Sequence, residues 1–210
     1  EIETLSTSPS SRLAEIPMVG HYLEELELIE VKVSSLEGIE HCQKLRRFVL
    51  DSCILEPVEL TDEAFLKPLR CCWELTEVCI YMQQIYPNCP NWDRWPIGRA
   101  YDVIDSLEPL GRLTKLKRLV LQQCRKLKSA RIPKLPALEE LYVHMHGWSE
   151  PRKGHRFDEL EPLLGALNLR YLELVSCPAI MDVTPLAKLN ALERVHLVQS
   201  SHLLSTLHDD

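Results

Sequence analysis

LRYLELVSC, at residues 169–177, is the stretch that decides the fold, because close copies of it recur along the chain. Residues 116–124 read LKRLVLQQC, and residues 45–53 read LRRFVLDSC. Each copy has apolar residues at its first, fourth and sixth places and Cys at its ninth. A phrase that returns with fixed internal spacing indicates a repeat architecture.

Seven copies of this phrase, with variation at the ninth place, begin at residues 23, 45, 75, 116, 138, 169 and 192. The short steps between them are 22 and 23 residues, so the repeating unit has about that length. We interpret the longer steps of 30, 41 and 31 residues as the same unit carrying insertions. Seven matches to one template are hard to obtain by chance.

A second pattern precedes the phrases, in which apolar residues recur at every third position, as in Leu110, Leu113 and Leu116. This spacing predicts a 3₁₀-like turn or one face of a brief helix. A proline often opens the segment, and proline suits a first helical turn because its missing N–H is not needed there. The sixth unit offers Leu167 and then Leu169, one residue short, so we expect a local irregularity there.

The phrase and its spacing resemble the leucine-rich repeat family, and within it the short 22-residue class of bacterial internalins and of regulatory subunits of protein phosphatase-1. The resemblance implies an α/β fold: a curved solenoid of about seven repeats, with a parallel sheet on the concave side and 3₁₀ or short helical turns on the convex side. The leucines would be buried between successive repeats. The ninth place would point inward and satisfy backbone groups.

This reading divides the chain into three parts. Residues 1–20 are polar and Ser-rich, and we expect a cap or a disordered lead-in. Residues 21–204 form the repeat domain, with insertions at 54–68, 85–102 and 147–159, and residues 205–210 form a tail. Thr61 is a candidate cap for a short helix in the first insertion.

The composition argues against several classes of function. A net charge of −7 disfavours a nucleic-acid partner, because phosphate-binding domains are usually basic. The chain has no apolar run long enough to span a membrane, and its first residues do not read as a signal peptide. It also has no HExxH, phosphate-binding loop or nucleophile elbow, so the sequence predicts neither a cofactor nor a metal.

The repeat accounts for most of the eight cysteines. Three occupy the ninth place, and Cys42 and Cys72 take leucine positions of the period-three pattern, where a free Cys acts as a small hydrophobe. Buried free thiols favour an intracellular, reducing compartment, the cytoplasm or nucleus, with an organelle left open. The remaining cysteines lack the CxxC spacing of a zinc site, and Cys79 is the candidate nucleophile if the protein is an enzyme.

The resemblance places the residues between the buried leucines on the concave face. The first repeat presents acids there, and the middle repeats present aromatic residues, Val and Met, a composition typical of a protein interface. The alternative is that these are ordinary half-exposed strand residues. The predicted concave binding residues are Glu27, Val49, Tyr81, Met82, Val120, Tyr142, His144, Val175 and His196.

Two insertions carry three of the four tryptophans. Tyr86, Trp92 and Trp95 lie in the insertion at 85–102, and Trp148 lies in the insertion at 147–159. Both follow a strand phrase, so we expect the two loops to converge around the fourth repeat. A Trp in such a loop is either the loop's own anchor or a binding hot spot.

These observations predict a non-catalytic module or scaffold subunit that holds a protein partner within a hetero-complex. Alternatives of the same kind are the recognition region of a ubiquitin-ligase receptor of the F-box type, a phosphatase regulatory subunit and the sensing region of an immune receptor. An enzyme using Cys79 or His144 and a nucleic-acid-binding protein are the alternatives from other classes. The repeat pattern is specific for fold and nearly silent about function.

Overall fold

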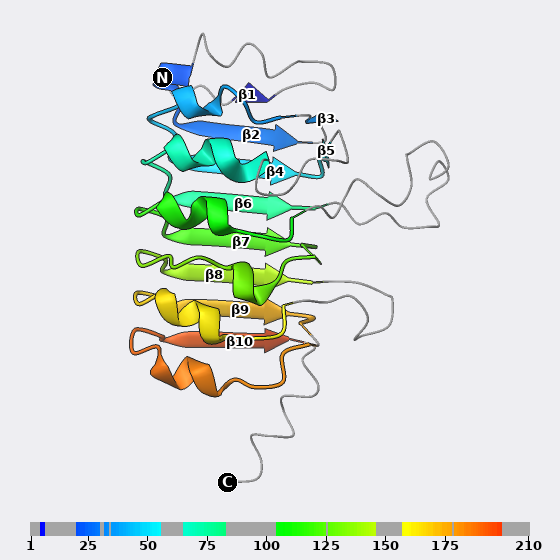
Figure 1. Cartoon of the computed structure of the whole chain (residues 1–210), viewed down its shortest axis with the longest axis vertical. Helices are drawn as coiled ribbons and strands as arrows, with labels where there is room; N and C mark the ends of the chain where they lie inside the picture. Colours follow the sequence, from blue (N-terminus) through cyan, green and yellow to red (C-terminus); the bar gives the residue numbers. More distant parts are fainter. Residues whose placement is uncertain are drawn as a thin grey trace, which may run out of the picture.

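The computed structural model describes residues 5–6, 20–29, 32–33, 35–55, 65–82, 104–124, 126–145, 157–177 and 179–198. Its main feature is one parallel sheet of eight strands that follow one another in chain order (Figure 1). The strands are β1 (Leu5–Ser6), β2 (Glu25–Ile29), β4 (Arg47–Asp51), β6 (Glu77–Tyr81), β7 (Arg118–Gln122), β8 (Glu140–His144), β9 (Tyr171–Val175) and β10 (Arg194–Val198). A separate two-stranded sheet pairs β3 (Lys32–Val33) with β5 (Ile54–Leu55).

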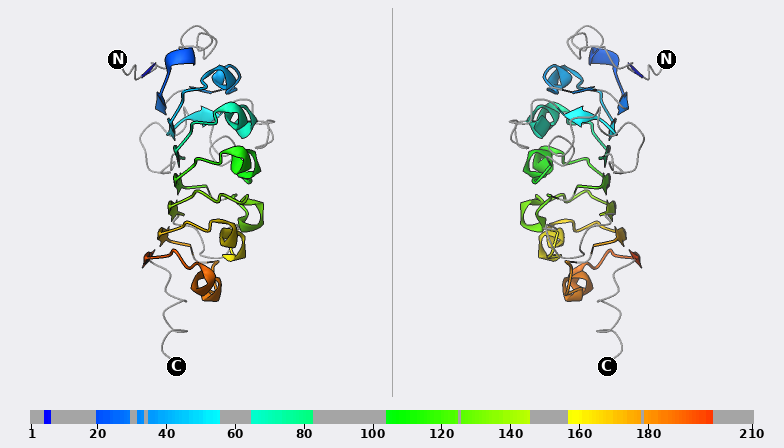
Figure 2. Two further views of the ribbon diagram at one scale, coloured as in Figure 1. Left: turned by 90° about the vertical axis from the view of Figure 1, so that its left-hand side faces the viewer. Right: turned by 90° about the vertical axis from the view of Figure 1, so that its right-hand side faces the viewer.

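Short 3₁₀ helices line the side opposite the sheet, and the strands lie along a gently concave side (Figure 2). The 3₁₀ helices are η2 (Gly20–Tyr22), η3 (Ile39–His41), η4 (Lys67–Cys71), η6 (Glu108–Arg112), η7 (Ser129–Arg131), η8 (Glu161–Gly165) and η9 (Thr184–Lys188). Four of them, η4, η6, η8 and η9, have Pro in the first turn, as the sequence predicted. The structure confirms a leucine-rich repeat solenoid of about seven repeats.

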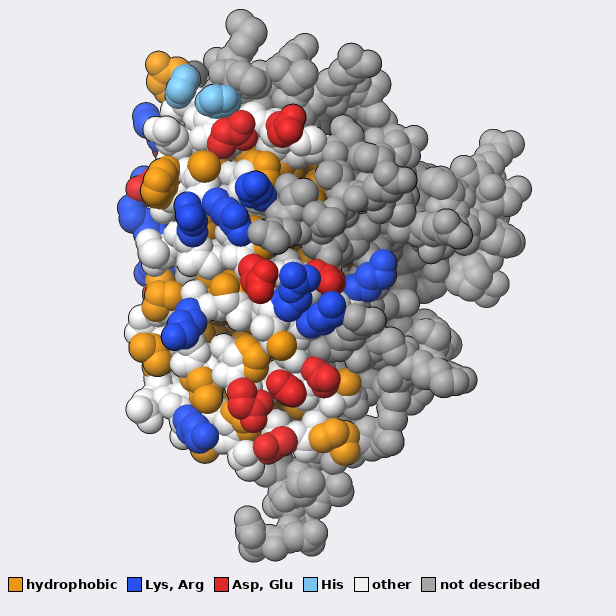
Figure 3. All heavy atoms as spheres, in the orientation of Figure 1, with side chains coloured by type: hydrophobic (Ala, Val, Ile, Leu, Met, Phe, Trp, Pro, Cys, Tyr) orange, Lys and Arg blue, Asp and Glu red, His pale blue; other side chains and the backbone are white. Residues whose placement is uncertain are grey.

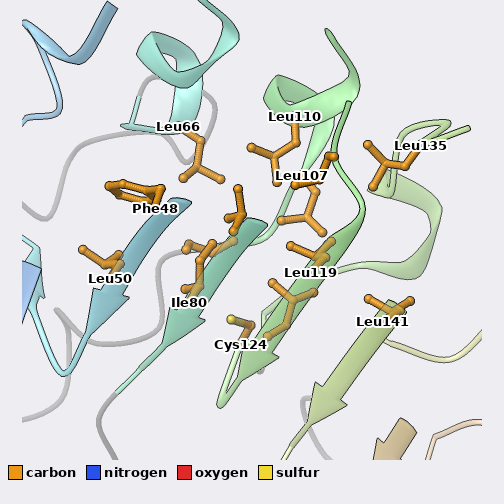
Figure 4. Packing of buried hydrophobic residues seen from close by; sticks show 14 of the residues in the cluster. Phe48, Leu50, Leu66, Ile80, Leu107, Leu110, Leu119, Cys124, Leu135 and Leu141 are labelled. Atoms are coloured by element: carbon orange, nitrogen blue, oxygen red, sulfur yellow. The ribbon is translucent and has the colours of Figure 1, made fainter. Parts of the chain in front are cut away.

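The buried leucines form one continuous core between the sheet and the helices (Figure 4). In the fourth repeat the period-three residues stack inward, and the N–H of Leu113 donates to the carbonyl of Leu110 at 2.9 Å. The N–H of Leu116 continues the series to the carbonyl of Leu113 at 3.1 Å. The apolar side chain and the backbone bond recur together, because a turn with three residues per revolution returns to the same face every third residue.

The sixth repeat is regular, so the expected irregularity is wrong. Its inward series runs Leu163, Ala166, Leu169, with hydrogen bonds of 2.8 and 3.1 Å between successive members. Leu167, which the sequence pattern placed in this series, is 69% exposed in the turn before β9. The small Ala166 fills the inward position. The sequence pattern was based on leucines and therefore assigned Leu167 to that position.

The ninth-place cysteines point inward, as predicted, and two of them bond to the preceding repeat. The thiol of Cys53 donates to the carbonyl of Leu28 at 3.1 Å, and the thiol of Cys177 lies 3.6 Å from the carbonyl of Val143. Leu28 and Val143 occupy the same sixth place in their phrases. Burial raises the pKa of the Cys177 thiol to about 12, so this thiol stays protonated and able to donate.

The third and fifth phrases, which lack Cys at the ninth place, close differently. Met82 and Met145 stand one place earlier, at the eighth, and both are buried in the core. The prediction that Met82 belongs to the exposed concave surface is therefore wrong. In the phrases that end in Cys, the eighth residue takes a left-handed backbone instead, with φ of 52° at Ser52 and 54° at Ser176.

The last described repeat is the least covered. Val195 of β10 is 40% exposed, whereas its neighbour in register on β9, Leu172, is 0% exposed. Each inward residue is covered by the next repeat, and the described residues supply no such repeat beyond β10.

Among the described helices, none has the length and apolar character needed to cross a membrane.

We predict that Leu172→Ala costs about 2–5 kcal/mol of the free energy of unfolding, because it leaves a cavity between two repeats. Val195→Ala, at the equivalent place on β10, should cost less than about 1 kcal/mol because the side chain is already partly in water. Urea unfolding followed by circular dichroism measures both. Equal costs would show that the end repeat is covered in solution.

Candidate protein-binding face

The outward side chains of the sheet form three columns that run across the strands in register. We call them the edge, middle and far columns, for the first, third and fifth residues of each strand. The edge column is Glu25, Arg47, Glu77, Arg118, Glu140, Tyr171 and Arg194. The middle column is Glu27, Val49, Cys79, Val120, Tyr142, Glu173 and His196. The far column is Ile29, Asp51, Tyr81, Gln122, His144, Val175 and Val198.

The edge column is a ladder of alternating charge. Arg47 Nη1 lies 3.7 Å from Glu25 and its Nε lies 3.5 Å from Glu77. Arg118 bridges the next interval, at 3.7 Å from Glu77 and 3.5 Å from Glu140. Sequence reasoning missed this column because its first column began two residues later, at Glu27; the alternation of acid and base just before the second apolar place was the available signal.

Two tyrosines and two arginines pack over the half of the face formed by β7 to β10, which we call the lower half. The rings of Tyr142 and Tyr171 have their centroids 5.0 Å apart at an interplanar angle of 37°. The guanidinium of Arg118 lies 5.1 Å from the centre of Tyr142, and that of Arg194 lies 5.9 Å from the centre of Tyr171. Stacked cations and rings hold these side chains in fixed positions before any partner arrives. Tyr171 was absent from the predicted site.

Glu173 is the polar centre of this half. Its carboxylate lies 2.8 Å from His144 Nε2 and 3.3 Å from His196 Nδ1, and it accepts a 2.5 Å hydrogen bond from the hydroxyl of Tyr171. The bond from Tyr171 is the main cause that lowers the pKa of Glu173, and the bonds from the two histidines add to it. The structure thus brings the predicted His144 and His196 together on one carboxylate.

An apolar cluster lies at the centre of the face, separate from the main core. It consists of Val49, Cys79 and Val120, with Tyr81 and Tyr142 packed against it. Val49 and Val120 are buried, as is Val175 on β9, so these predicted binding residues lie on the concave side but offer little surface themselves. The accessible groups are the tyrosines and the charged side chains around them.

The predicted loop residues Tyr86, Trp92, Trp95 and Trp148 lie outside the described residues. The fourth tryptophan, Trp73, lies in the turn between η4 and β6 and is 63% exposed. Of the linker at 54–68, only its ends are described, and Phe65 and Leu66 there form a buried helical turn that leads into η4.

Cys79 has the wrong environment for a nucleophile. Burial, and then its hydrogen bond to Glu77 at 3.3 Å, raise the pKa of the thiol to about 11. A thiol with that pKa is protonated at neutral pH, whereas the nucleophile in cysteine catalysis is the thiolate. Within the described residues no group of three or more His, Cys, Asp or Glu could hold a metal ion, the Glu173 cluster included.

Comparisons with solved structures support the fold. An internalin, inlF of Listeria monocytogenes, is 19% identical with a TM-score of 0.56, and the match covers 91% of this chain and 47% of that one. A second internalin of the same organism, inlC2, is 19% identical with a TM-score of 0.50, covering 92% of this chain and 80% of that one. This chain spans about half the length of the first, and at this identity the likeness shows the fold alone.

Searches with the sequence found no matching family model and no matching curated protein. The support for a leucine-rich repeat fold from comparisons thus comes from the likeness to the two internalin structures. Membership of the short 22-residue class, and the similarity to phosphatase-1 subunits, stay predictions.

We expect the stability supplied by Glu173 to depend on pH. Its folded pKa is lower than the ordinary carboxyl value of 4.5, so the contribution is present above 4.5 and is lost as the pH falls through the folded value. Glu173→Gln removes it. The difference in urea midpoint between the native protein and this variant should shrink as the pH falls below 4.5. A difference that grew over that range would contradict the assignment.

Thiol labelling tests the cysteine environments. Cys71 is the one exposed cysteine among those described, and Cys79 is buried with a raised pKa. Iodoacetamide at neutral pH, followed by mass spectrometry of the native protein, should modify Cys71 at least tenfold faster than Cys79, since the thiolate is the reacting form. A selectively fast Cys79 would revive the enzyme hypothesis. Labelling in urea provides the control, because both should then react at similar rates.

Proposed function

We propose that the protein is a non-catalytic interaction module that holds another protein on its concave sheet face. The observation that carries this proposal is the patch of Tyr142, Tyr171, Arg118 and Arg194, which is ordered by its own contacts and faces outward from a rigid sheet. Tyrosine and arginine are the residue types that most often dominate binding energy at protein interfaces.

Preorganisation gives the patch its value. A side chain that is loose in the free protein loses rotational freedom on binding, at a cost of about 0.5–1.5 kcal/mol each. Here Tyr142 donates to Glu140 at 3.0 Å and Tyr171 donates to Glu173, so both rings are already held. A partner that docks on them pays little of this cost.

The raised pKa of Cys79 argues against catalysis by that thiol, so the interaction module is the stronger hypothesis. None of the seven described cysteines is in a disulfide, and all but Cys71 are buried. This supports the proposal of a reducing compartment, although it does not choose between the cytoplasm, the nucleus and an organelle.

Finer roles rest on the resemblance alone. A subunit of a hetero-complex, a ubiquitin-ligase recognition region and a phosphatase regulatory subunit each fit a concave protein-binding face. The aromatic loop residues Tyr86, Trp92, Trp95 and Trp148 belong to the proposal as a second contact area. The sequence of the full gene would separate these roles, because an F-box or another flanking domain would be visible there.

The test is affinity purification from the native source, followed by a binding measurement with the recovered partner. We expect Tyr81→Ala with Tyr142→Ala to weaken binding by roughly 30-fold or more, as loss of a hot spot does. The matched control is Trp73→Ala with Leu167→Ala, which removes two exposed apolar side chains that lie in turns outside the sheet face. Circular dichroism should show that both variants remain folded, so that a loss of binding is not a loss of structure. Weaker binding by the control alone would exclude the concave face.

A further inference from the structure

The half of the concave face formed by β2, β4 and β6, which we call the upper half, carries an excess of carboxylates. On β2, β4 and β6 the three columns contain one cation, Arg47, whereas they contain the acids Glu25, Glu27, Asp51 and Glu77. Arg47 pairs with Glu27 and also lies 3.5 Å from Glu77 and 3.7 Å from Glu25. One guanidinium is therefore shared among three carboxylates, of which Glu77 also has Arg118 of β7 at 3.7 Å.

That sharing leaves negative charge at the surface. A guanidinium has five N–H donors in one plane and cannot serve three carboxylates with good geometry at once. The side chain of Glu25 is 37% exposed and that of Glu27 is 24% exposed. Asp51, on the far column, accepts a hydrogen bond from Ser52 at 2.8 Å, a neutral donor that leaves its charge in place.

The lower half of the same face is balanced. On β7 to β10, Arg118 and Arg194 match Glu140 and Glu173 in number, and two histidines surround Glu173. On the opposite side of the molecule, acidic and basic side chains alternate down the stack (Figure 3). There Asp105, for example, pairs with Lys128 at 3.2 Å and with Arg131 at 2.7 Å. The acidic excess is thus a local property of the upper concave face.

An aromatic residue stands beside the acids. Tyr81 is the register partner of Asp51, and it packs on the apolar cluster of Val49, Cys79 and Val120. A cation placed over Asp51 would therefore lie beside an aromatic side chain, and guanidinium groups bind aromatic rings well. The charge and the ring together favour arginine over a neutral or acidic side chain.

We propose that the partner docks a basic segment here: one or more Arg or Lys side chains over Glu25, Glu27 and Asp51, next to an apolar side chain on Tyr81. The partner's cation would supply the charge that Arg47 alone cannot supply. This inference rests on the proposed function and specifies the chemistry of the partner. A bare metal ion is a poor alternative, since the described residues hold no group fit to bind one.

The first experiment uses three synthetic peptides of equal length and equal apolar content that differ only in carrying Arg, Gln or Glu at the same positions. Fluorescence anisotropy with the native protein should show binding of the Arg peptide, weakened by added salt, and much weaker binding of the other two. Equal binding of the Arg and Glu peptides would overturn the inference.

A variant and its control sharpen the result. Glu25→Gln with Asp51→Asn removes two carboxylates and keeps the pair of Glu27 with Arg47. We expect it to bind the Arg peptide about tenfold more weakly, given the usual worth of exposed charge pairs. Glu37→Gln with Glu161→Gln makes the same change in net charge at exposed sites away from the sheet and should bind as the native protein does. Equal losses in both variants would indicate a non-specific charge effect and would overturn the inference.

A second experiment separates this inference from the proposed function. A photoreactive amino acid replaces Ile29, the exposed register partner of Asp51 on β2, and in a second protein it replaces Lys188 in η9. Mass spectrometry identifies the partner segment attached after illumination in a native extract. A basic segment attached through position 29 supports the inference. An acidic or neutral segment at that position overturns it and leaves the proposed function standing, and attachment only through position 188 contradicts both.

Discussion

One carbonyl in each repeat holds the stack in register. The carbonyl of Glu24 accepts hydrogen bonds from the N–H groups of both Arg46 and Arg47, at 2.7 and 3.1 Å. The carbonyl of Arg46 accepts the equivalent two bonds from the next repeat. The pattern continues to the carbonyl of Arg170, the residue before β9. Because a slip of one residue would turn every leucine outward, this contact and the leucine layer enforce the same register. No repeat can bury its apolar face alone, so the two act together.

That register produces the columns of the concave face. Parallel strands lie about 4.8 Å apart, so residues at equal places in successive phrases become lateral neighbours. Neighbours of like charge at that distance repel and neighbours of opposite charge attract, which makes the alternation of Glu25, Arg47, Glu77, Arg118 and Glu140 favourable. The inward leucines and the shared carbonyls set the register of the columns, so the outward residues can vary while that register is kept. This separation explains why so regular a scaffold can present an uneven surface.

The sequence predicted the structure at positions where the same residue types recur. It failed where one repeat has a different residue type at an equivalent position. The strands, the prolines of the helical turns and the inward cysteines follow from spacing alone. Ala166 was missed because a small residue takes an inward place that other repeats fill with leucine or cysteine. Met82 was assigned to the wrong face because the phrase around β6 closes without a ninth-place Cys and buries the eighth residue instead. The cluster around Glu173 joins residues 29 and 23 positions apart, which register alone brings together.

The burial of the valines changes what the concave face offers a partner. Val49 and Val120 support the tyrosines from below, as part of a small second core on the outer side of the sheet. A partner therefore meets aromatic rings and charges that rest on a packed layer, and the energy of docking depends on how well it matches them. Shape is supplied by the repeat and is shared by other proteins of this fold. For the proposed function, we expect specificity to come from the places where the columns break their own pattern: three carboxylates around Arg47, and two histidines around Glu173.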